Sequence, residues 1–489
     1  MRMLLALILA LPLASHAVRV QILHTNDLHS YFDGTRDGLG GYARLKTLVD
    51  RLRAEARAQG IETLFLDGGD FGEGASYYVV DRGAESLRML GRLGVDATVI
   101  GNHDTMQGGQ GLAEQIDRAG VRTQVLSANL NESLARVLAG KVRPLAVFNL
   151  GGKRVAVGGL TTSELHFQYP VLNEGKILNP LTKIGAIEAE ARRQKADLVI
   201  ALTHIGLKLD RQLVARSRDI DLVIGGHSHT RMERAETPRN RRRRAIPIVQ
   251  AGAHSMALGQ TVMEIPDRGG PRLVSYRTHT IDQHIPRDPT LHAAVSQAQA
   301  LRSQYFERDW DEVIGSAEFP LQGHVNGHTP VRASCWGAHV AQVSREATGA
   351  DVGLNVSGFF GETIPMGPIT FGDLIDNYPH FRAFGDKGWT LAKVKLPGSV
   401  VKALLAFRRT HRSRYGLDVS VQGEISASKL YTMAFPGEIS WALEQVAPVL
   451  RGWIRGRVEQ TEAAVWESLE IYVRARSPLS CPTPSLENT

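Results

Sequence analysis

Cysteine is scarce in this chain of 489 residues, which contains only Cys335 and Cys481. Two thiols are too few for a Cys-rich zinc finger or for the disulfide framework of a small secreted scaffold. They can form at most one disulfide, and the sequence leaves open whether they pair or remain free thiols. With 43% hydrophobic and 22% charged residues, the composition excludes a collagen-like or broadly disordered chain. The length, roughly two to three times that of a typical domain, predicts two domains.

Long apolar runs are also rare. The one at residues 3–13 is too short to span a bilayer as a stable helix. Arg2 precedes it, and the small residues Ser15 and Ala17 are typical of a signal-peptidase site after Ala17. No cysteine lies at that site, which argues against a lipoprotein anchor. We therefore expect residues 1–17 to be a signal peptide and the mature chain to be a periplasmic or secreted protein without membrane contact. An uncleaved N-terminal anchor is the alternative.

A broad basic face is missing as well, although the formal net charge is +7. Five arginines fall within residues 239–244, and Arg2 adds a sixth; without these six, 51 basic residues face 50 acidic ones. No aromatic residue interleaves with the run, so a nucleic-acid groove is not predicted. We interpret the run as a solvated loop, with an anion-binding segment or a protease processing site as alternatives.

Two familiar catalytic motifs are absent: there is no G-x-S-x-G nucleophile elbow and no P-loop. Instead, five short apolar segments each end in His, Asp or Asn. These segments, at residues 18–23, 63–66, 97–100, 197–202 and 221–224, are typical of buried strands. Helical patterns at 42–59 and 84–93 alternate with them, which predicts an α/β fold. Ligands in such folds bind beyond the carboxyl ends of the strands, so we expect the polar residues to meet there.

These strand ends supply a set of metal ligands that contains no thiolate. Asp, His and Asn suit divalent Mn, Zn, Fe or Co. More than four ligands imply two divalent metal ions that share one carboxylate, as in dinuclear hydrolase sites. Such a pair clamps a phosphate and lowers the pKa of a water molecule, so that a metal-bound hydroxide attacks phosphorus and no protein nucleophile is needed.

The motifs that carry these residues resemble a known family. DLH at residues 27–29, GD at 69–70, GNHD at 101–104, TH at 203–204 and GHSH at 226–229 are similar to the ordered blocks of the calcineurin-like metallophosphoesterases. The opening HTNDLH, GGHSHT at 225–230 and VQAGA at 249–253 are similar to the 5′-nucleotidase branch. The resemblance implies a four-layer α/β/β/α sandwich over residues 18–285, followed by a smaller α+β domain.

The resemblance also implies roles for individual residues. One ion would be held by Asp27, His29, Asp70 and His229. The other would be held by Asp70, Asn102, His204 and His227, with Asp70 as the bridge. His103 would stabilise the transition state or protonate the leaving oxygen.

The surroundings of His103 depart from the family pattern. The family usually has an acid three residues after this histidine, and here the position is Met106. Asp104 is therefore included with His103 as a catalytic candidate that could orient the ring. Asp67 is a further candidate for a carboxylate that supports a ligand side chain without touching the metal. It is equally well interpreted as an aspartate at a strand end or in a turn.

The second half of the chain resembles the family less closely. We expect a linker helix at 286–310 and a divergent 5′-nucleotidase-like substrate domain at 311–489, with helices at 336–348 and 400–409 and a strand at 351–356. The family arginine that grips the substrate phosphate is Phe360 here, and a Phe cannot donate such bonds. The two aromatic residues that would sandwich a base are not evident. Substitutes could come from Arg332, Arg382 or Arg408 and from Tyr431, Phe435 or Trp441, although core packing is favoured for each.

Taken with the resemblance, the sequence predicts an exported dinuclear phosphoesterase that acts on small anionic phosphoesters. Nucleotides are the leading class of substrate. One alternative is a non-nucleotide hydrolase of the same superfamily, such as a thiosulfohydrolase of sulfur oxidation. Another is a ligand-binding or partner-binding protein whose metal site is vestigial. The sequence does not indicate the oligomeric state.

Overall fold

The structure is a computed structural model. It describes residues 17–164, 171, 174–323, 335–361, 363–378, 389–440, 443–444, 447–454 and 456–481, with the backbone alone at 359, 411–415 and 438. The predicted signal peptide, apart from Ala17, lies outside the described residues. Within these ranges, every helix is too short or too polar to be a membrane span.

A seven-stranded sheet forms the first layer of strands, in the order β12-β11-β1-β2-β3-β4-β5. Strand β1 is an interior strand of this sheet, parallel to β2 and antiparallel to β11. Its side chains alternate, so that Val20 and Ile22 face one core while Leu23 faces another. The strands are β1 (Val18–Thr25), β2 (Glu62–Asp67), β3 (Ala97–Val99), β4 (Gln124–Leu126), β5 (Val142–Arg143), β11 (Ala257–Ile265) and β12 (Arg272–Thr280).

A five-stranded sheet faces the first one, in the order β10-β9-β8-β7-β6. Side chains from both sheets, including Leu64 and Ile200, share one buried core, so the two sheets pack face to face. The strands are β6 (Leu145–Leu150), β7 (Lys153–Thr161), β8 (Leu198–His204), β9 (Leu222–Ile224) and β10 (Ile248–Val249).

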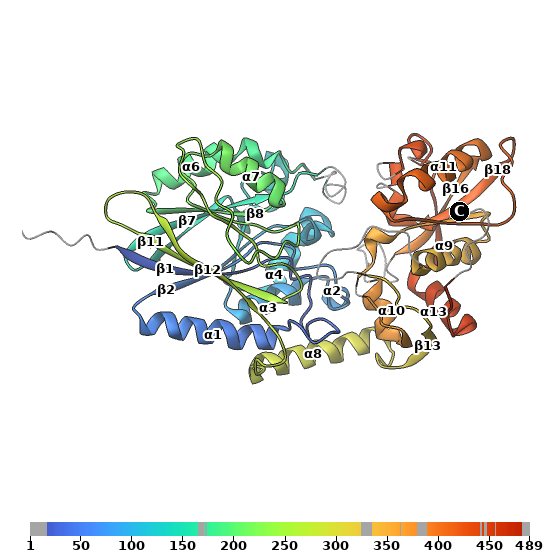
Figure 1. The fold of residues 1–489 in the computed structure, drawn as a ribbon, viewed down its shortest axis with the longest axis horizontal. Helices are drawn as coiled ribbons and strands as arrows, with labels where there is room; N and C mark the ends of the chain where they lie inside the picture. The colour runs from blue at the N-terminus through green and yellow to red at the C-terminus, as the bar shows by residue number, and fades with distance from the viewer. Residues whose placement is uncertain are drawn as a thin grey trace, which may run out of the picture.

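Helices cover the outer face of each sheet (Figure 1). On the first sheet, α1 (Tyr42–Ala58), α3 (Ala84–Leu93) and α4 (Gly108–Ala119) bury a second core. On the other sheet, α6 (Ile184–Arg193) and α7 (Leu207–Arg216) bury a third. The predicted four-layer α/β/β/α sandwich is therefore confirmed, and the predicted strands and helices agree with the observed ones within about two residues at most ends.

The chain then runs through α8 (Pro289–Phe306) into a second, smaller domain (Figure 1). The side chain of Asp288 accepts a hydrogen bond from the Leu291 amide and so caps α8. Leu291 and Val295 belong to the core beneath α1, which anchors the first half of α8 to the first domain. The boundaries predicted at 285 and 310 stay predictions.

The second domain is an α+β unit around a five-stranded sheet, in the order β17-β14-β18-β16-β19. It has a large hydrophobic core of its own. The sheet strands are β14 (Val352–Val356), β16 (Thr390–Pro397), β17 (Leu417–Val421), β18 (Leu430–Pro436) and β19 (Glu459–Ala464). A two-stranded sheet joins β13 (Val313–Ala317) and β15 (Gly367–Thr370), and the longer helices are α9 (Cys335–Thr348), α11 (Gly398–Tyr415) and α13 (Val465–Arg476).

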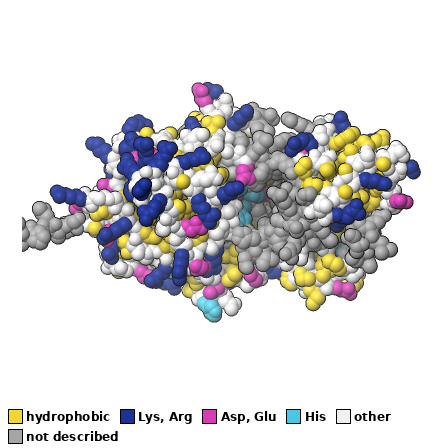
Figure 2. Space-filling model, turned by 45° about the horizontal axis from the view of Figure 1, so that its top comes forward, with side chains coloured by type: hydrophobic (Ala, Val, Ile, Leu, Met, Phe, Trp, Pro, Cys, Tyr) yellow, Lys and Arg dark blue, Asp and Glu magenta, His cyan; other side chains and the backbone are white. Residues whose placement is uncertain are grey.

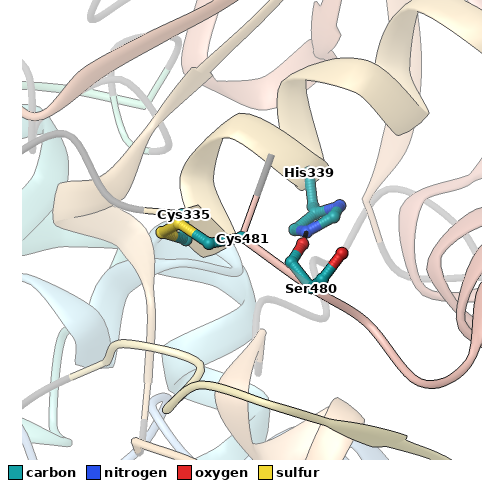
Figure 3. The surroundings of a disulfide bond; sticks show 4 residues. All are labelled: Cys335, His339, Ser480 and Cys481. Atoms are coloured by element: carbon teal, nitrogen blue, oxygen red, sulfur yellow. Dashed lines mark hydrogen bonds between the residues drawn. A yellow bond between two sulfur atoms is a disulfide. The ribbon is translucent and has the colours of Figure 1, made fainter. Parts of the chain in front are cut away.

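A disulfide joins the two cysteines that the sequence left unassigned (Figure 3). It links Cys335, at the start of α9, to Cys481, 146 residues later. Beside it, His339 Nε2 donates to the Ser480 carbonyl oxygen at 3.0 Å, and His339 Nδ1 lies 2.8 Å from the Tyr472 hydroxyl on α13. The disulfide therefore closes a long loop and ties the C-terminal segment to the body of the second domain.

Candidate metal centre

The loops that leave the strand ends converge at one edge of the sandwich. The Asp27 amide donates to the Gly69 carbonyl oxygen, and the His29 amide donates to that of Asp70, each at 2.8 Å. These bonds join the loop after β1 to the loop after β2. Glycine is required where the loops meet: a Cβ at Gly226 would lie 2.4 Å from the Gly68 carbonyl oxygen and 2.9 Å from His204 Nδ1.

All seven predicted ligands lie in this one cluster. Their closest approaches are His204 Nε2 to Asp70 Oδ2 at 3.0 Å, His204 Nε2 to Asn102 Oδ1 at 3.2 Å, His29 Nε2 to His229 Nε2 at 3.2 Å and His229 Nε2 to Asp27 Oδ1 at 3.3 Å. Their metal-ligating role stays a prediction, but the strand-end pattern located the side chains correctly.

Asp70 lies between two parts of the cluster. It forms one group of closely spaced ligand atoms with His204 and His227, and another with His29 and His103. Its Oδ2 lies 3.8 Å from His29 Nε2. This central place is the one that a bridging carboxylate would need.

The cluster concentrates charge in a buried setting, because Asp27 and His204 have no exposed surface and Asp70 is 1% exposed. Burial alone would raise the pKa of Asp70, but the imidazoles of His204 and His103 hold it well below its usual value. Burial lowers the pKa of His29 to about 4, which favours the neutral imidazole that binds metals. Two buried carboxylates among imidazoles and an amide oxygen are a donor set that fits divalent cations.

Backbone strain marks the same residues. Asp27, His29, Asp70, His227 and His229 all have positive φ angles, between 49° and 75°. This left-handed conformation is unfavourable for residues with a Cβ and persists where the surroundings enforce it, often at functional sites.

The carboxylate that contacts His103 comes from Glu73, which sequence reasoning missed. Glu73 Oε2 pairs with His103 Nδ1, and the Glu73 side chain is only 2% exposed. The His103 amide also donates to Asp70 Oδ1 at 2.8 Å. Burial would lower the pKa of His103, but the Asp70 and Glu73 carboxylates outweigh it and raise the pKa to about 9. A signal was present in the sequence, since Glu73 stands between two glycines three residues after an expected ligand.

Asp104, which was considered as a residue that orients His103, and Asp67, the further carboxylate considered at the site, have other partners. The carboxylate of Asp104 accepts three backbone N–H bonds, from Asp70 at 3.0 Å, Gly72 at 2.9 Å and Gly101 at 2.7 Å. Asp104 thus fixes the loops that carry the cluster. Asp67 accepts hydrogen bonds from Thr25 and Thr98 on the neighbouring strands, which supports its interpretation as a strand-end aspartate.

The substitutes considered in the second domain are structural wherever they are described. Phe360 is 1% exposed and packs near Trp336 and Tyr378 in the core, and Phe435 is fully buried there. Arg408 donates to the Leu417 carbonyl oxygen at 3.1 Å, and Tyr431 packs against the core. Arg332, Arg382 and Trp441 lie outside the described residues.

A cavity of about 210 Å³ lies between the two domains, and one residue of its lining, Tyr31, follows the predicted ligand His29 by two positions. Tyr31, Asp33 and Arg36 line it from the first domain, and Asp373 and Asp376 line it from the second. Figure 2 shows histidine side chains at the surface in the hollow between the domains. The lining of the cavity is largely polar.

The arginine run lies at the other end of β9 from the cluster. Arg244 pairs with Asp221, which precedes β9, and Arg242 Nη1 lies 2.9 Å from Asp219. The Arg241 amide donates to the Ser217 carbonyl oxygen, just after α7. His227, in contrast, follows β9. The run is therefore a surface loop away from the cluster, as its main interpretation predicted.

Two family models match the chain. Residues 20–231 match the calcineurin-like phosphoesterase model, and residues 313–436 match the 5′-nucleotidase C-terminal domain. Together they cover more than half of the chain. The first match, with the four-layer fold, defines the class of the first domain: it is a calcineurin-like phosphoesterase domain. The two domains in this order place the chain in the 5′-nucleotidase family.

Known proteins agree with this assignment. The chain is 32% identical over 343 residues to the 5′-nucleotidase of Mus musculus and 30% identical over 340 residues to that of Homo sapiens, with 64% of this chain matched in each case. Both matches span 58% of the relative's length, so the chain corresponds to under two thirds of these curated relatives.

Solved structures show the same fold. A 5′-nucleotidase precursor from Thermus thermophilus superposes with a TM-score of 0.80 at 22% identity, covering 95% of this chain and 98% of the other. The sulfate thiohydrolase SoxB of Thermus thermophilus superposes with a TM-score of 0.71 at 18% identity, covering 95% of each chain. At these identities the likeness concerns the fold alone.

Proposed function

We propose that the protein is a metal-dependent phosphoesterase that hydrolyses small phosphate esters, with nucleotides as the preferred class. The observation that carries the proposal is the meeting of seven Asp, His and Asn side chains, with Asp70 among them in a central place, at one edge of the sandwich. Membership of the 5′-nucleotidase family supports the same activity.

The cluster would hold two divalent ions of Mn, Zn, Fe or Co. One would take Asp27, His29, Asp70 and His229, and the other would take Asp70, Asn102, His204 and His227. When bound, such a pair clamps a phosphoryl group and lowers the pKa of a water molecule. The buried carboxylates and the imidazole nitrogens fit this demand.

His103 would act on the leaving group. Its imidazole borders the cluster, with the ring centroid 4.7 Å from that of His29. Glu73 holds Nδ1, which leaves Nε2 as the atom that can give a proton to the leaving oxygen. Glu73 is a positioning residue in this account. Asp104 acts indirectly, because it fixes the loops that carry the cluster.

The rest of the substrate would occupy the cavity between the domains. Its lining includes the Tyr31 ring, the Asp33 carboxylate and the Arg36 guanidinium, which pairs with Asp373 across the domains. With Phe360 in the core, phosphate recognition would rest on the ions and His103. These features fit a small hydroxylated leaving group such as a nucleoside, and no polymeric nucleic acid is expected as a partner.

Export is part of the proposal. The Cys335–Cys481 disulfide is typical of an oxidising compartment, as the predicted signal peptide requires. The intact mass of protein isolated from its native cells should correspond to a chain that begins at Val18. A mass that includes residues 1–17 would contradict export by cleavage.

A substrate panel tests the activity. Metal-reconstituted protein should release phosphate from nucleoside 5′-monophosphates faster than from sugar phosphates or cyclic nucleotides. Inactivity toward all phosphoesters, with metal bound, would favour the thiosulfohydrolase alternative. The sulfate thiohydrolase SoxB has the same fold as this chain.

A further inference from the structure

An eighth candidate ligand, His254, lies at the metal centre. It belongs to the loop between β10 and β11, which follows the VQAGA segment at 249–253. Ligand nitrogens of His254, His29 and His229 all lie within 4.8 Å of one another. The ring centroid of His254 is 5.7 Å from that of His29 and 5.6 Å from that of His229. Three imidazoles therefore converge on one side of the cluster.

The backbone of His254 has a positive φ angle, as the backbones of most of the predicted ligands do. Its φ is +55°, and that of Ser255 is +56°, in the left-handed region that five of the seven predicted ligands also occupy. The His254 amide donates to the Asp27 carbonyl oxygen at 2.8 Å, which fixes this loop directly to a ligand loop. A strained backbone held in this way indicates a functional demand on the side chain.

The ring of His254 is held in place from its other side. The residue is 4% exposed, and the Tyr31 ring stacks on the imidazole with centroids 4.1 Å apart and planes 22° apart. Ser255 Oγ, next along the chain, accepts from the Gly41 amide at 2.8 Å. The imidazole is therefore pre-positioned, as the ligands of a metal site must be.

We propose that His254 is a further nitrogen ligand of the ion assigned to Asp27, His29, Asp70 and His229. This inference rests on the proposed function, because it concerns the same metal centre. It makes the two ions unequal: one site would have three imidazoles, and the other would have two imidazoles and the Asn102 amide oxygen. Imidazole-rich sites suit Zn and Fe, whereas oxygen-rich sites suit Mn. The His254 site should therefore prefer Zn over Mn more strongly than the second site does.

Metal titration of His254→Phe tests the inference. A Phe keeps a ring to stack on Tyr31 but removes both nitrogens. Apo-protein titrated with Co²⁺ and Zn²⁺ should show one ion bound at least about tenfold more weakly than in the wild type, with the other ion little changed. The visible Co²⁺ spectrum should also change, because one nitrogen ligand is lost. His279→Phe, on β12 outside the cluster, is the matched control and should bind both ions as the wild type does.

A second variant guards against misfolding. His254→Gln should weaken the same ion, and thermal unfolding of each apo variant reports whether the chain is folded. Unchanged dissociation constants and Co²⁺ spectra in a folded His254 variant would overturn the inference while leaving the proposed function intact. Failure of the wild type itself to bind divalent ions would overturn both.

Discussion

Among single residues, Asp70 is the most important in the proposed centre, because it is assigned to both ions. Because it lies between both groups of ligands, Asp70→Asn should lower the content of both ions and abolish phosphoester hydrolysis. Metal analysis of the purified variant beside activity measures both effects. Asp221→Asn, a buried aspartate paired with Arg244 before β9, is the control and should retain its metal. Two ions bound by Asp70→Asn would show that the bridge is wrongly assigned.

The Glu73–His103 pair gives a second test at this scale. His103→Asn should keep the metal content and reduce turnover by about 10²–10⁴-fold, as expected of a general acid. Glu73→Gln should lower kcat with little change in KM, because the Glu73 carboxylate pairs with the His103 ring. The substitution keeps the Glu73 carbonyl oxygen, which lies 2.7 Å from His29 Nδ1.

Two further measurements separate positioning from simple destabilisation. In the His103→Asn background, Glu73→Gln should reduce turnover little further, because the effects of substituting two residues that act as a unit do not add. Both variants should lose less activity with nitrophenyl phosphate, whose leaving group needs no proton. Additive losses with every substrate would contradict the assigned role.

Sequence reasoning at the residue scale worked where polar side chains follow buried strands. Asp27, Asp70, Asn102 and His204 could be located because a strand of known direction delivers each of them to one sheet edge. Glu73 and His254 escaped because irregular loops place them, and the geometry of such loops depends on contacts distant in the sequence. Asp104 was found, but its bonds to three backbone amides could not be foreseen without the loop conformation.

At the scale of elements, the arginine run and its loop offer a clear prediction. The loop lies at the opposite end of β9 from His227, so Arg241→Gln with Arg243→Gln should leave kcat/KM for an anionic phosphoester within about twofold at low salt. Arg36→Gln, which lines the cavity, is the contrasting variant and should raise KM. A steep, salt-dependent loss of kcat/KM on changing the loop would show that it steers substrate.

The disulfide is the second feature at this scale. Replacing Cys335 and Cys481 by Ser frees a segment of 146 residues in the unfolded chain and should lower the free energy of unfolding of the second domain by about 2–5 kcal/mol. Denaturant unfolding of the double variant and the wild type, with and without reductant, measures the effect. The prediction would be contradicted if reductant did not change the stability of the wild type and if the wild type and the variant were equally stable.

Elements were predictable in proportion to their apolar periodicity. Helix α3 was predicted at its observed bounds, and β1 runs two residues beyond its prediction because the polar His24 and Thr25 still pair within the sheet. Helix α11 extends well past the predicted 409, through a polar stretch that has no apolar signal.

At the scale of the whole molecule, the two domains differ in how much their sequences disclosed. The first domain combines the motif blocks with strong strand patterns, so its fold could be predicted, and so could the sheet edge at which the polar side chains meet. In the second, the diverged loop places Phe360 in a hydrophobic core, and sequence alone cannot show which polar groups replace the lost arginine. The cavity between the domains, with carboxylates from both, depends on tertiary packing that no local pattern encodes.

The central claim is that this centre is a working dinuclear site, and its most direct test is a metal titration followed by phosphate release. Apo-protein should bind two divalent ions per chain on reconstitution with Mn or Zn, and hydrolysis of a nucleoside 5′-monophosphate should rise as the second ion binds. Fewer than one ion bound per folded chain, or hydrolysis that does not depend on metal, would contradict the account.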